Sequence, residues 1–182
     1  MKALPVLVGL LILASGCISS QGIPTTKQGV QVRQNPIFGP QPGEQAPAFT
    51  VTTTDARTIS LDSLTQYKKP VVLYFFATWC STCIEDLKQA KQVYPAYANR
   101  IEFIAADLDL EENKEVIDAF VKRYGFEGFR NFALPQEQLL VDYRITQTST
   151  KYLINRDGIV VFSHSGATNT EGWKRIFESL LQ

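Results

Sequence analysis

The sequence predicts an α/β fold with a mixed central sheet that is covered by helices on both faces. Three observations predict it. Residues 70–77 form a nearly unbroken apolar run of strand length, which is typical of a central strand buried on both faces. Segments with the spacing of amphipathic helices alternate with further apolar runs along the chain. The last two runs flank Arg156-Asp157-Gly158, a strong hairpin signal, so parallel and antiparallel pairs should share one sheet.

Ahead of the central strand, the chain predicts an N-terminal β-hairpin extension. Residues 48–52 and 57–61 are short β-prone runs on either side of the turn-like pair Thr54-Asp55. Residues 62–67 can add one or two helical turns. We therefore expect a hairpin and a short helix before the sheet begins.

An amphipathic helix should follow the central strand. Its apolar side chains recur at three- and four-residue steps, at Cys83, Leu87, Ala90 and Val93 or Tyr94. Pro95 should kink or end this helix, because proline lacks the backbone N–H that the next helical hydrogen bond needs. A strand followed by a helix is the first half of a βαβ unit.

The middle of the chain repeats this alternation. Residues 101–106 predict a second strand, and residues 111–124 predict a helix that Gly125 can end. The inward face of that helix should comprise Val116, Phe120, Val121 and Tyr124. Residues 132–134 and 136–143 are then expected to form a short strand and another helix.

The C-terminal part should complete the sheet and cover it. Residues 151–155 and 159–162 predict the strands of the closing hairpin, and residues 170–181 predict the last helix. The inward face of this helix should comprise Trp173, Ile176, Phe177 and Leu180. His164 is expected in a solvated loop after the last strand.

Composition limits the classes of function. The 182 residues and the hydrophobic fraction of 45% suit one globular domain with appendages. Eighteen basic and eighteen acidic residues cancel, and no basic run interrupts them, so we expect no nucleic-acid partner. Proteins or small molecules are the expected partners, and we expect the protein to be a monomer.

The first residues predict export. Residues 1–16 have the layout of a signal peptide, with a charged start, an apolar stretch and small residues before Cys17. The apolar stretch is well short of the roughly 20 residues that a membrane-spanning helix needs. The segment from Leu13 to Cys17 resembles the lipobox of prokaryotic lipoproteins, in which the signal is cut before the cysteine and the cysteine carries lipid. An ordinary cleaved signal with an incidental Cys17 remains the alternative.

The segment after the signal predicts a lipidated, flexible tether. Residues 17–45 carry several Gln, Gly, Pro, Ser and Thr residues and little apolar periodicity, so they cannot bury enough apolar surface to fold alone. The folded domain should then span residues 46–182. We expect lipid on Cys17 to anchor the protein to the extracytoplasmic face of the cell membrane.

Cys80 and Cys83 carry the chemistry that the sequence predicts. They stand three positions apart where the central strand gives way to a helix, so both sulfurs lie on one side of the first turn and can form a disulfide. Helix N-termini stabilise a thiolate, so we expect Cys80 to be the more exposed, attacking nucleophile and Cys83 the resolving thiol. Structural zinc would need a second ligand pair, and a static disulfide over so short a loop would add little stability. We expect neither a metal nor a cofactor.

Four stretches resemble the TlpA/ResA group of thioredoxin-like proteins, namely residues 43–49, Leu61, residues 69–83 and residues 152–158. The strand followed by Trp79-Cys80-x-x-Cys83 is the specific part, and the resemblance covers about residues 43–182. It implies a thioredoxin fold and disulfide exchange with exported proteins, often during cytochrome c maturation. We expect reduction of their disulfides, with electrons supplied by a membrane thiol.

The chain departs from this resemblance near the cysteines. Thioredoxins proper carry a buried carboxylate six residues before the first cysteine, where this chain has Tyr74. TlpA/ResA proteins place a glutamate three residues after the second cysteine, and here Asp86 stands there. Asp86 could accept a proton from the thiols, with Glu85 as a less favoured substitute. The alternative is that Asp86 lies on a solvated helix face and has no catalytic duty.

A further departure is Ser149, which replaces the cis-proline that faces the active site in the family. A cis bond before a non-proline residue costs roughly 2.5 to 4 kcal/mol, so the Thr148-Ser149 bond should be trans. The Ser149 hydroxyl could then hydrogen-bond the Cys80 thiolate or a docking peptide. We expect Trp79, Thr148 and Ser149 to contact the substrate.

Two rival functions remain open on the same fold. A copper-delivery protein of the Sco type would space its cysteines by three residues and carry a histidine where this chain has Gln147, although thiolates alone can bind Cu(I). A thiol peroxidase would carry a threonine where this chain has Ala77. Both rivals fit the residues less well than thiol-disulfide exchange does.

Overall fold

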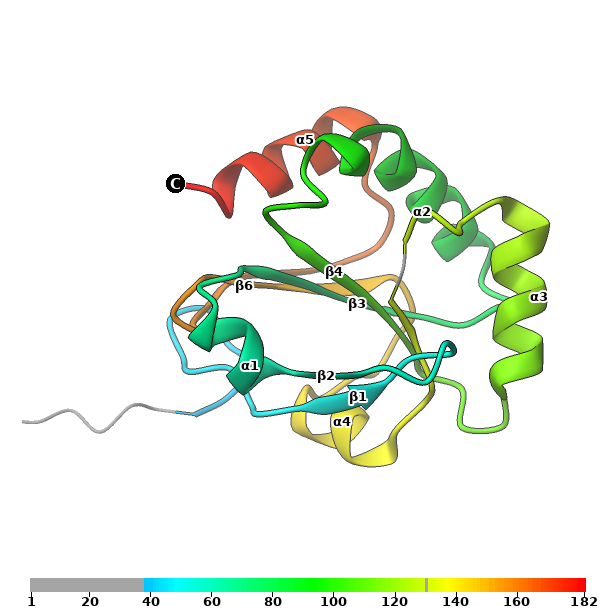
Figure 1. Cartoon of the computed structure of the whole chain (residues 1–182), viewed down its shortest axis with the longest axis horizontal. Coiled ribbons are helices and arrows are strands. Elements are labelled where there is room, and N and C mark those ends of the chain that lie inside the picture. The colour runs from blue at the N-terminus through cyan, green and yellow to red at the C-terminus, as the bar shows by residue number, and fades with distance from the viewer. Residues whose placement is uncertain (1–37, 130) are drawn as a thin grey trace, which may run out of the picture. The chain divides into compact units, whose positions relative to one another are not determined.

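A five-stranded sheet forms the centre of the domain in the computed structural model, which describes residues 38–129 and 131–182 (Figure 1). Its strands are β3 (Val71–Phe76), β4 (Glu102–Asp107), β5 (Phe132–Ala133), β6 (Thr150–Ile154) and β7 (Val160–Ser165). Their order across the sheet is β5-β4-β3-β6-β7. β4 runs parallel to β3 and β5, whereas β6 is antiparallel to β3 and β7. The predicted mixed sheet is confirmed.

Helices cover both faces of this sheet, as predicted (Figure 1). They are α1 (Leu61–Gln66), α2 (Ser81–Val93), α3 (Lys114–Tyr124), α4 (Glu137–Asp142) and α5 (Thr170–Ser179), with a short 3₁₀ helix η1 (Tyr94–Ala96) after α2. α2, α3 and α5 lie on one face, and α1 and α4 lie on the other. The predicted hairpin is also present, because β1 (Thr50–Thr52) pairs antiparallel with β2 (Thr58–Ser60) on the side of α1 and α4.

The central strand β3 divides the core into two layers, because successive side chains of a strand point to opposite faces. All six residues of β3 are buried. Val72, Tyr74 and Phe76 pack with apolar side chains of α2, α3 and α5, and the residues between them pack with those of α1, α4 and the hairpin. Burial on both faces explains the continuous apolar run, and it gives the cysteine-bearing turn beyond Phe76 a rigid base.

The predicted inward face of α3 is wrong at its first position. The Asn113 side chain caps the helix by accepting the Val116 N–H at 3.1 Å, so α3 begins at Lys114, later than residue 111. Ile117 and Phe120 are buried, whereas Val116 is 41% exposed. The buried stripe therefore begins at Ile117, because residues three apart share one helix face.

The C-terminal strand is longer than predicted. β7 extends to Ser165 and includes His164, which we expected in a loop. The pairing with β6 continues until Ser165 stands opposite Thr150 and His164 opposite Lys151. The prediction was wrong because the polar residues after Phe162 end the apolar run but not the hydrogen-bonded ladder. His164 is solvent-exposed, as expected.

The predicted ends of α2 and α3 agree with the structure. α2 ends at Val93, and η1 follows with Pro95 inside it. Gly125 ends α3 in the left-handed conformation, with a φ of 67°. Within α5, Trp173 and Phe177 are fully buried.

The N-terminal predictions fall mostly outside the described residues. The signal peptide, Cys17 and most of the tether lie there. The last tether residues are described, and Gly43, Glu44 and Ala46 exchange backbone hydrogen bonds with Gly158 and Val160 of the closing hairpin. Within residues 38–129 and 131–182, no helix is both long and apolar enough to cross a membrane.

Candidate active site

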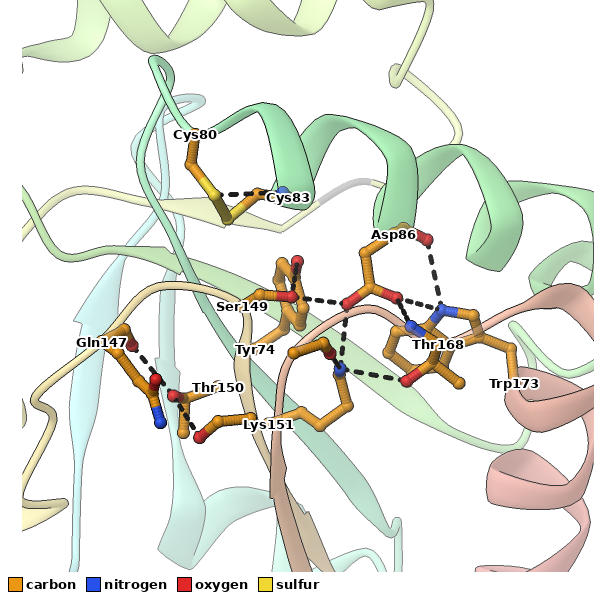
Figure 2. Close-up of polar contacts among 12 residues, drawn as sticks. Tyr74, Cys80, Cys83, Asp86, Gln147, Ser149, Thr150, Lys151, Thr168 and Trp173 are labelled. Carbon is orange, nitrogen blue, oxygen red and sulfur yellow. Dashed lines mark hydrogen bonds and ion pairs between the residues drawn. A yellow bond between two sulfur atoms is a disulfide. The ribbon is translucent and has the colours of Figure 1, made fainter.

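The two cysteines lie where β3 leads into α2 and are joined in a disulfide (Figure 2). Cys80 is the N-cap of α2, and Cys83 follows within the first turn, with 5.2 Å between their Cα atoms. The burial of β3 fixes the start of this turn, and the amphipathic packing of Leu87 and Ala90 fixes the helix. The fold thereby holds the two sulfurs side by side, as the spacing predicted.

The helix N-terminus favours negative charge on the Cys80 sulfur. The Cys83 backbone N–H points at Cys80 Sγ, with 3.0 Å between nitrogen and sulfur, and the dipole of the 13-residue helix α2 acts in the same sense. Cys80 retains 5% of its surface exposed and Cys83 none, so Cys80 is the more accessible of the two, as predicted. A thiolate on Cys80 would therefore be both stabilised and reachable.

Trp79 lies at the surface beside a groove. Its side chain is 64% exposed, and its indole N–H donates to Asp109 Oδ2 at 2.7 Å. This hydrogen bond is the main cause that lowers the pKa of Asp109. The groove has a volume of about 400 Å³ and is lined by Trp79, Leu108, Leu140, Ile145, Thr146, Gln147 and Thr148. The structure thus brings Trp79 and Thr148 to one apolar groove.

Asp86 is fully buried one turn beyond Cys83, so the alternative of a solvated helix face is wrong. Its Oδ1 accepts the Thr168 backbone N–H at 2.9 Å and the Trp173 indole N–H at 2.8 Å. Its Oδ2 accepts the Ser149 hydroxyl at 2.8 Å and lies 2.9 Å from Lys151 Nζ (Figure 2). These four donors fill the roughly four acceptor positions of a carboxylate.

Lys151 belongs to the polar cluster beside the disulfide, and sequence reasoning missed it. It is fully buried on β6, opposite Tyr74 of β3, and forms an ion pair with Asp86. Its ammonium also donates to the Gly166 carbonyl at 2.6 Å and to Thr168 Oγ1 at 3.1 Å, so all three N–H groups have acceptors. Burial lowers the pKa of Lys151, and Asp86 opposes this effect. The signal in the sequence that could have identified Lys151 is that it is the one charged residue within a buried strand, residues 150–154.

Ser149 confirms the expected trans bond and adds a contact with Asp86. No cis peptide bond occurs among the described residues, so the Thr148-Ser149 bond is trans, as predicted, and Ser149 adopts a left-handed φ of 58°. Its side chain is buried, and its hydroxyl donates to Asp86 and lies 3.2 Å from the Tyr74 hydroxyl. With Cys80 in a disulfide, the Ser149 hydroxyl is directed to the buried Asp86 carboxylate, which accepts its hydrogen bond, and the predicted contact with a Cys80 thiolate or a docking peptide stays a prediction.

Tyr74 completes the polar cluster behind the disulfide. Burial is the largest cause that raises the pKa of Tyr74 well above its ordinary value, and the charge of Asp86 adds to it. Lys151 Nζ lies 5.5 Å from the centre of the Tyr74 ring and 5.2 Å from that of Trp173. The phenol therefore stays neutral and cannot replace the buried carboxylate that thioredoxins proper carry at this position. Asp86 supplies a buried carboxylate from α2 instead.

Comparison with known proteins agrees with this geometry. The sequence pattern of the AhpC/TSA family matches residues 42–163. Thiol-disulfide oxidoreductase ResA of Bacillus cereus is 32% identical over 155 residues, which cover 84% of this chain and 81% of that protein. ResA of Bacillus thuringiensis is 30% identical over 156 residues, which cover 84% and 82%.

A solved structure shows the same fold. The thioredoxin-family thiol:disulfide interchange protein from Chlorobium tepidum matches with a TM-score of 0.65 and 22% identity, over 81% of this chain and 98% of that one. The expected thioredoxin fold is confirmed, and so is the resemblance to ResA-type proteins.

Proposed function

The chain belongs to the AhpC/TSA family, and we propose that it reduces disulfides in exported proteins. It is a thiol-disulfide oxidoreductase similar to ResA, and Cys80 and Cys83 are its redox pair. One observation carries the proposal: the disulfide lies at the N-terminus of α2, with its more exposed sulfur next to the exposed Trp79. Reduction, exported substrates and a role in cytochrome c maturation follow from the resemblance to the TlpA/ResA group.

The reaction begins from the reduced chain. The Cys80 thiolate attacks one sulfur of the substrate disulfide, forming a mixed disulfide and expelling the other substrate sulfur as a thiolate. The Cys83 thiolate then attacks Cys80 Sγ and expels the second substrate thiolate. The chain ends as the Cys80–Cys83 disulfide, and two electrons have passed to the substrate. A membrane dithiol would return the chain to its reduced form.

The cluster behind the disulfide supports a role for Asp86. The Cys83 thiol must lose its proton before it can resolve the mixed disulfide, and we propose Asp86 as the acceptor. In the oxidised chain every acceptor position of Asp86 is occupied, so proton transfer requires one donor to turn away. The Ser149 hydroxyl is the donor best suited to do so, because it is neutral and rotates about a single bond, whereas Lys151 carries the balancing charge.

The groove beside Trp79 supports a role in substrate binding. It is apolar at Leu108, Leu140 and Ile145. Thr148, which precedes the residue that replaces the family's cis-proline, also lines it. We propose that Trp79 and Thr148 contact the polypeptide that carries the substrate disulfide. Ser149 would act through its backbone and through Asp86, because its side chain is buried.

We also propose that lipid on Cys17 anchors the enzyme at the extracytoplasmic membrane surface. The sequence from Leu13 to Cys17 supports this, as does the tether that follows it. A Cys17→Ser variant should leave the membrane fraction while its rate of disulfide reduction stays the same. A variant that remains with the membranes would contradict the anchor, and a soluble but inactive one would contradict the independence of tether and site.

A reduction assay tests the proposed activity. The reduced protein should cleave the interchain disulfides of a model protein substrate. For each disulfide cleaved, the Cys80 and Cys83 thiols of one protein molecule should be oxidised. Cys80→Ser should abolish the reaction, and a Cys17→Ser chain serves as the matched cysteine control. If the protein reduces a hydroperoxide faster than it reduces the protein disulfide, the result would favour the peroxidase rival instead.

A further inference from the structure

A second group of carboxylates contacts the residues just before Cys80 and is not used in the reaction above. It belongs to the end of β4 and the loop that follows, at Asp107, Asp109 and Glu112. Because β3 and β4 are parallel, both strands end at the same edge of the sheet, and Asp107 stands opposite Phe76. This brings the acidic loop to the residues that lead into Cys80.

Asp107 is the buried member of the group. It has no exposed surface, and its Oδ1 accepts the Asp109 backbone N–H at 2.9 Å. Its Oδ2 has no hydrogen-bond donor among the described residues. Burial is the main cause that raises the pKa of Asp107 to about 8, and the neighbouring Glu112 carboxyl is the next. Because carboxylate oxygens only accept, a hydrogen bond between Asp107 and Glu112 would require a proton on one of them.

Glu112 connects this buried group to the turn. Its Oε2 accepts the Thr78 backbone N–H at 3.0 Å, and its Oε1 accepts the Thr78 hydroxyl. Asp109 meanwhile accepts the Trp79 indole N–H. The two residues that directly precede Cys80 are therefore both held by the acidic loop, and Glu112 holds the first of them through backbone and side chain together.

We propose that Asp107 and Glu112 share one proton and that this pair positions the Thr78-Trp79 turn from which Cys80 attacks. The proposal rests on the proposed function, because it assigns positioning residues to the same redox site. With the proton in place, Asp107 donates to Glu112 and fixes the oxygens that hold Thr78. When the proton leaves, two negative carboxylates face each other in a buried site and repel. Glu112, which is only partly buried, then swings outward and releases the turn.

Among the residues that the structure describes, the surroundings of Asp107 offer little else that could balance its charge. Its titratable neighbours are Glu112 and Asp109, both acidic and both in its own segment. From β3 the residue opposite it is Phe76, and from β5 the nearest paired residue is Ala133, beside Ala106. Neither ionises. In the reduced chain the Cys80 and Cys83 thiols follow this turn, and a negative thiolate on Cys80 would add to the repulsion.

Two substitutions distinguish the effect of the shared proton on the pH profile from the effect of thiol ionisation. Asp107→Asn keeps a donor toward Glu112 at every pH, whereas Glu112→Ala removes the contact with Thr78 at every pH. Glu112→Ala should disturb folding less, because Glu112 is partly exposed. Glu111→Gln is the matched control, because it removes an exposed carboxylate from the neighbouring position. The readout is kcat/KM for reduction of a disulfide-bonded peptide between pH 6 and pH 9.5.

The expected profiles differ in shape. Wild type and Glu111→Gln should lose activity several-fold as the pH rises through about 8, relative to Asp107→Asn. Glu112→Ala should have about tenfold lower kcat/KM at neutral pH, because a misplaced nucleophile loses its productive orientation. The same decline above pH 8 in Asp107→Asn as in wild type would overturn the proposal.

A carboxyl measurement separates failure of this inference from failure of the proposed function. The side-chain carboxyl carbon of Asp107, followed by NMR in the oxidised protein, should titrate near pH 8 and not near 4. Titration near 4 would overturn the shared proton even if the enzyme is active. Titration near 8 in a protein that reduces no disulfide at pH 7 would instead leave the pair intact and contradict the reductase function.

Discussion

Asp86 and Asp107 are both fully buried aspartates close to the redox pair, yet their surroundings compensate for burial in different ways. Asp86 faces the ammonium of Lys151 and three further donors, so a cation and three hydrogen bonds compensate for its burial. Asp107 faces Glu112 and lacks a donor for Oδ2 among the described residues, so a proton must take the place of the cation. The difference gives the site one carboxylate that is paired with a cation and one, Asp107, whose pKa burial raises to about 8.

The comparison predicts that loss of the Lys151 ammonium has the largest effect on the free energy of unfolding. Lys151→Met should leave Asp86 buried without a counter-charge and lower the free energy of unfolding by about 3 to 5 kcal/mol. Chemical denaturation of the oxidised protein measures this loss. Lys151→Met combined with Asp86→Leu should recover much of it, because no buried charge remains.

Lys114 provides the control for that substitution. It also forms an ion pair, with Asp118, but both side chains are about half exposed. Lys114→Met should therefore change the free energy of unfolding far less, because water already solvates both partners. If Lys151→Met and Lys114→Met lower the free energy of unfolding equally, the buried ion pair stabilises the fold no more than the exposed one.

The second effect is a dependence of the free energy of unfolding on pH, which we expect from Asp107. The folded pKa of Asp107, about 8, lies above its ordinary value of 3.8, so the folded protein binds a proton that the unfolded chain has released between these values. The free energy of unfolding of wild type should thus fall relative to Asp107→Asn by about 2 kcal/mol from pH 6 to pH 8. Denaturation curves at these two pH values test this, and a constant difference would mean that Asp107 does not titrate near pH 8 in the folded protein.

A smaller effect is expected for Ser149. Ser149→Ala removes one neutral donor from Asp86 and should lower the free energy of unfolding by about 1 to 2 kcal/mol. It should leave the pKa of the Cys80 thiol unchanged, because the hydroxyl is directed to Asp86. Alkylation rates of Cys80 against pH provide the test. A shifted Cys80 pKa would restore the direct contact between the hydroxyl and the thiolate that the sequence suggested.

Much of the fold was predictable because its strongest elements have local signals. The apolar run of β3, the spacing of α2 and the position of the cysteine pair between them follow from residues that are adjacent in the sequence. Gly125 and Pro95 also mark ends that depend on a single residue. Where the signal was weak, as for His164, the ladder of a neighbouring strand decided the structure.

The polar clusters could not be predicted in the same way, because they join distant segments. Lys151 reaches Asp86 only because β6 pairs with β3 in the register that sets Lys151 opposite Tyr74. Glu112 reaches Thr78 because β3 and β4 end together. The sequence shows which residues carry charge, but the sheet register decides which of them meet.

Mass spectrometry of the trapped intermediate tests the assignment of the nucleophile most directly. A reduced Cys83→Ser chain, mixed with a disulfide-bonded peptide, should accumulate a mixed disulfide on Cys80 that the missing resolving thiol cannot release. The matched Cys80→Ser chain should trap little peptide, because Cys83 is fully buried. Faster trapping through Cys83 in the Cys80→Ser chain would reverse the two roles and contradict the mechanism.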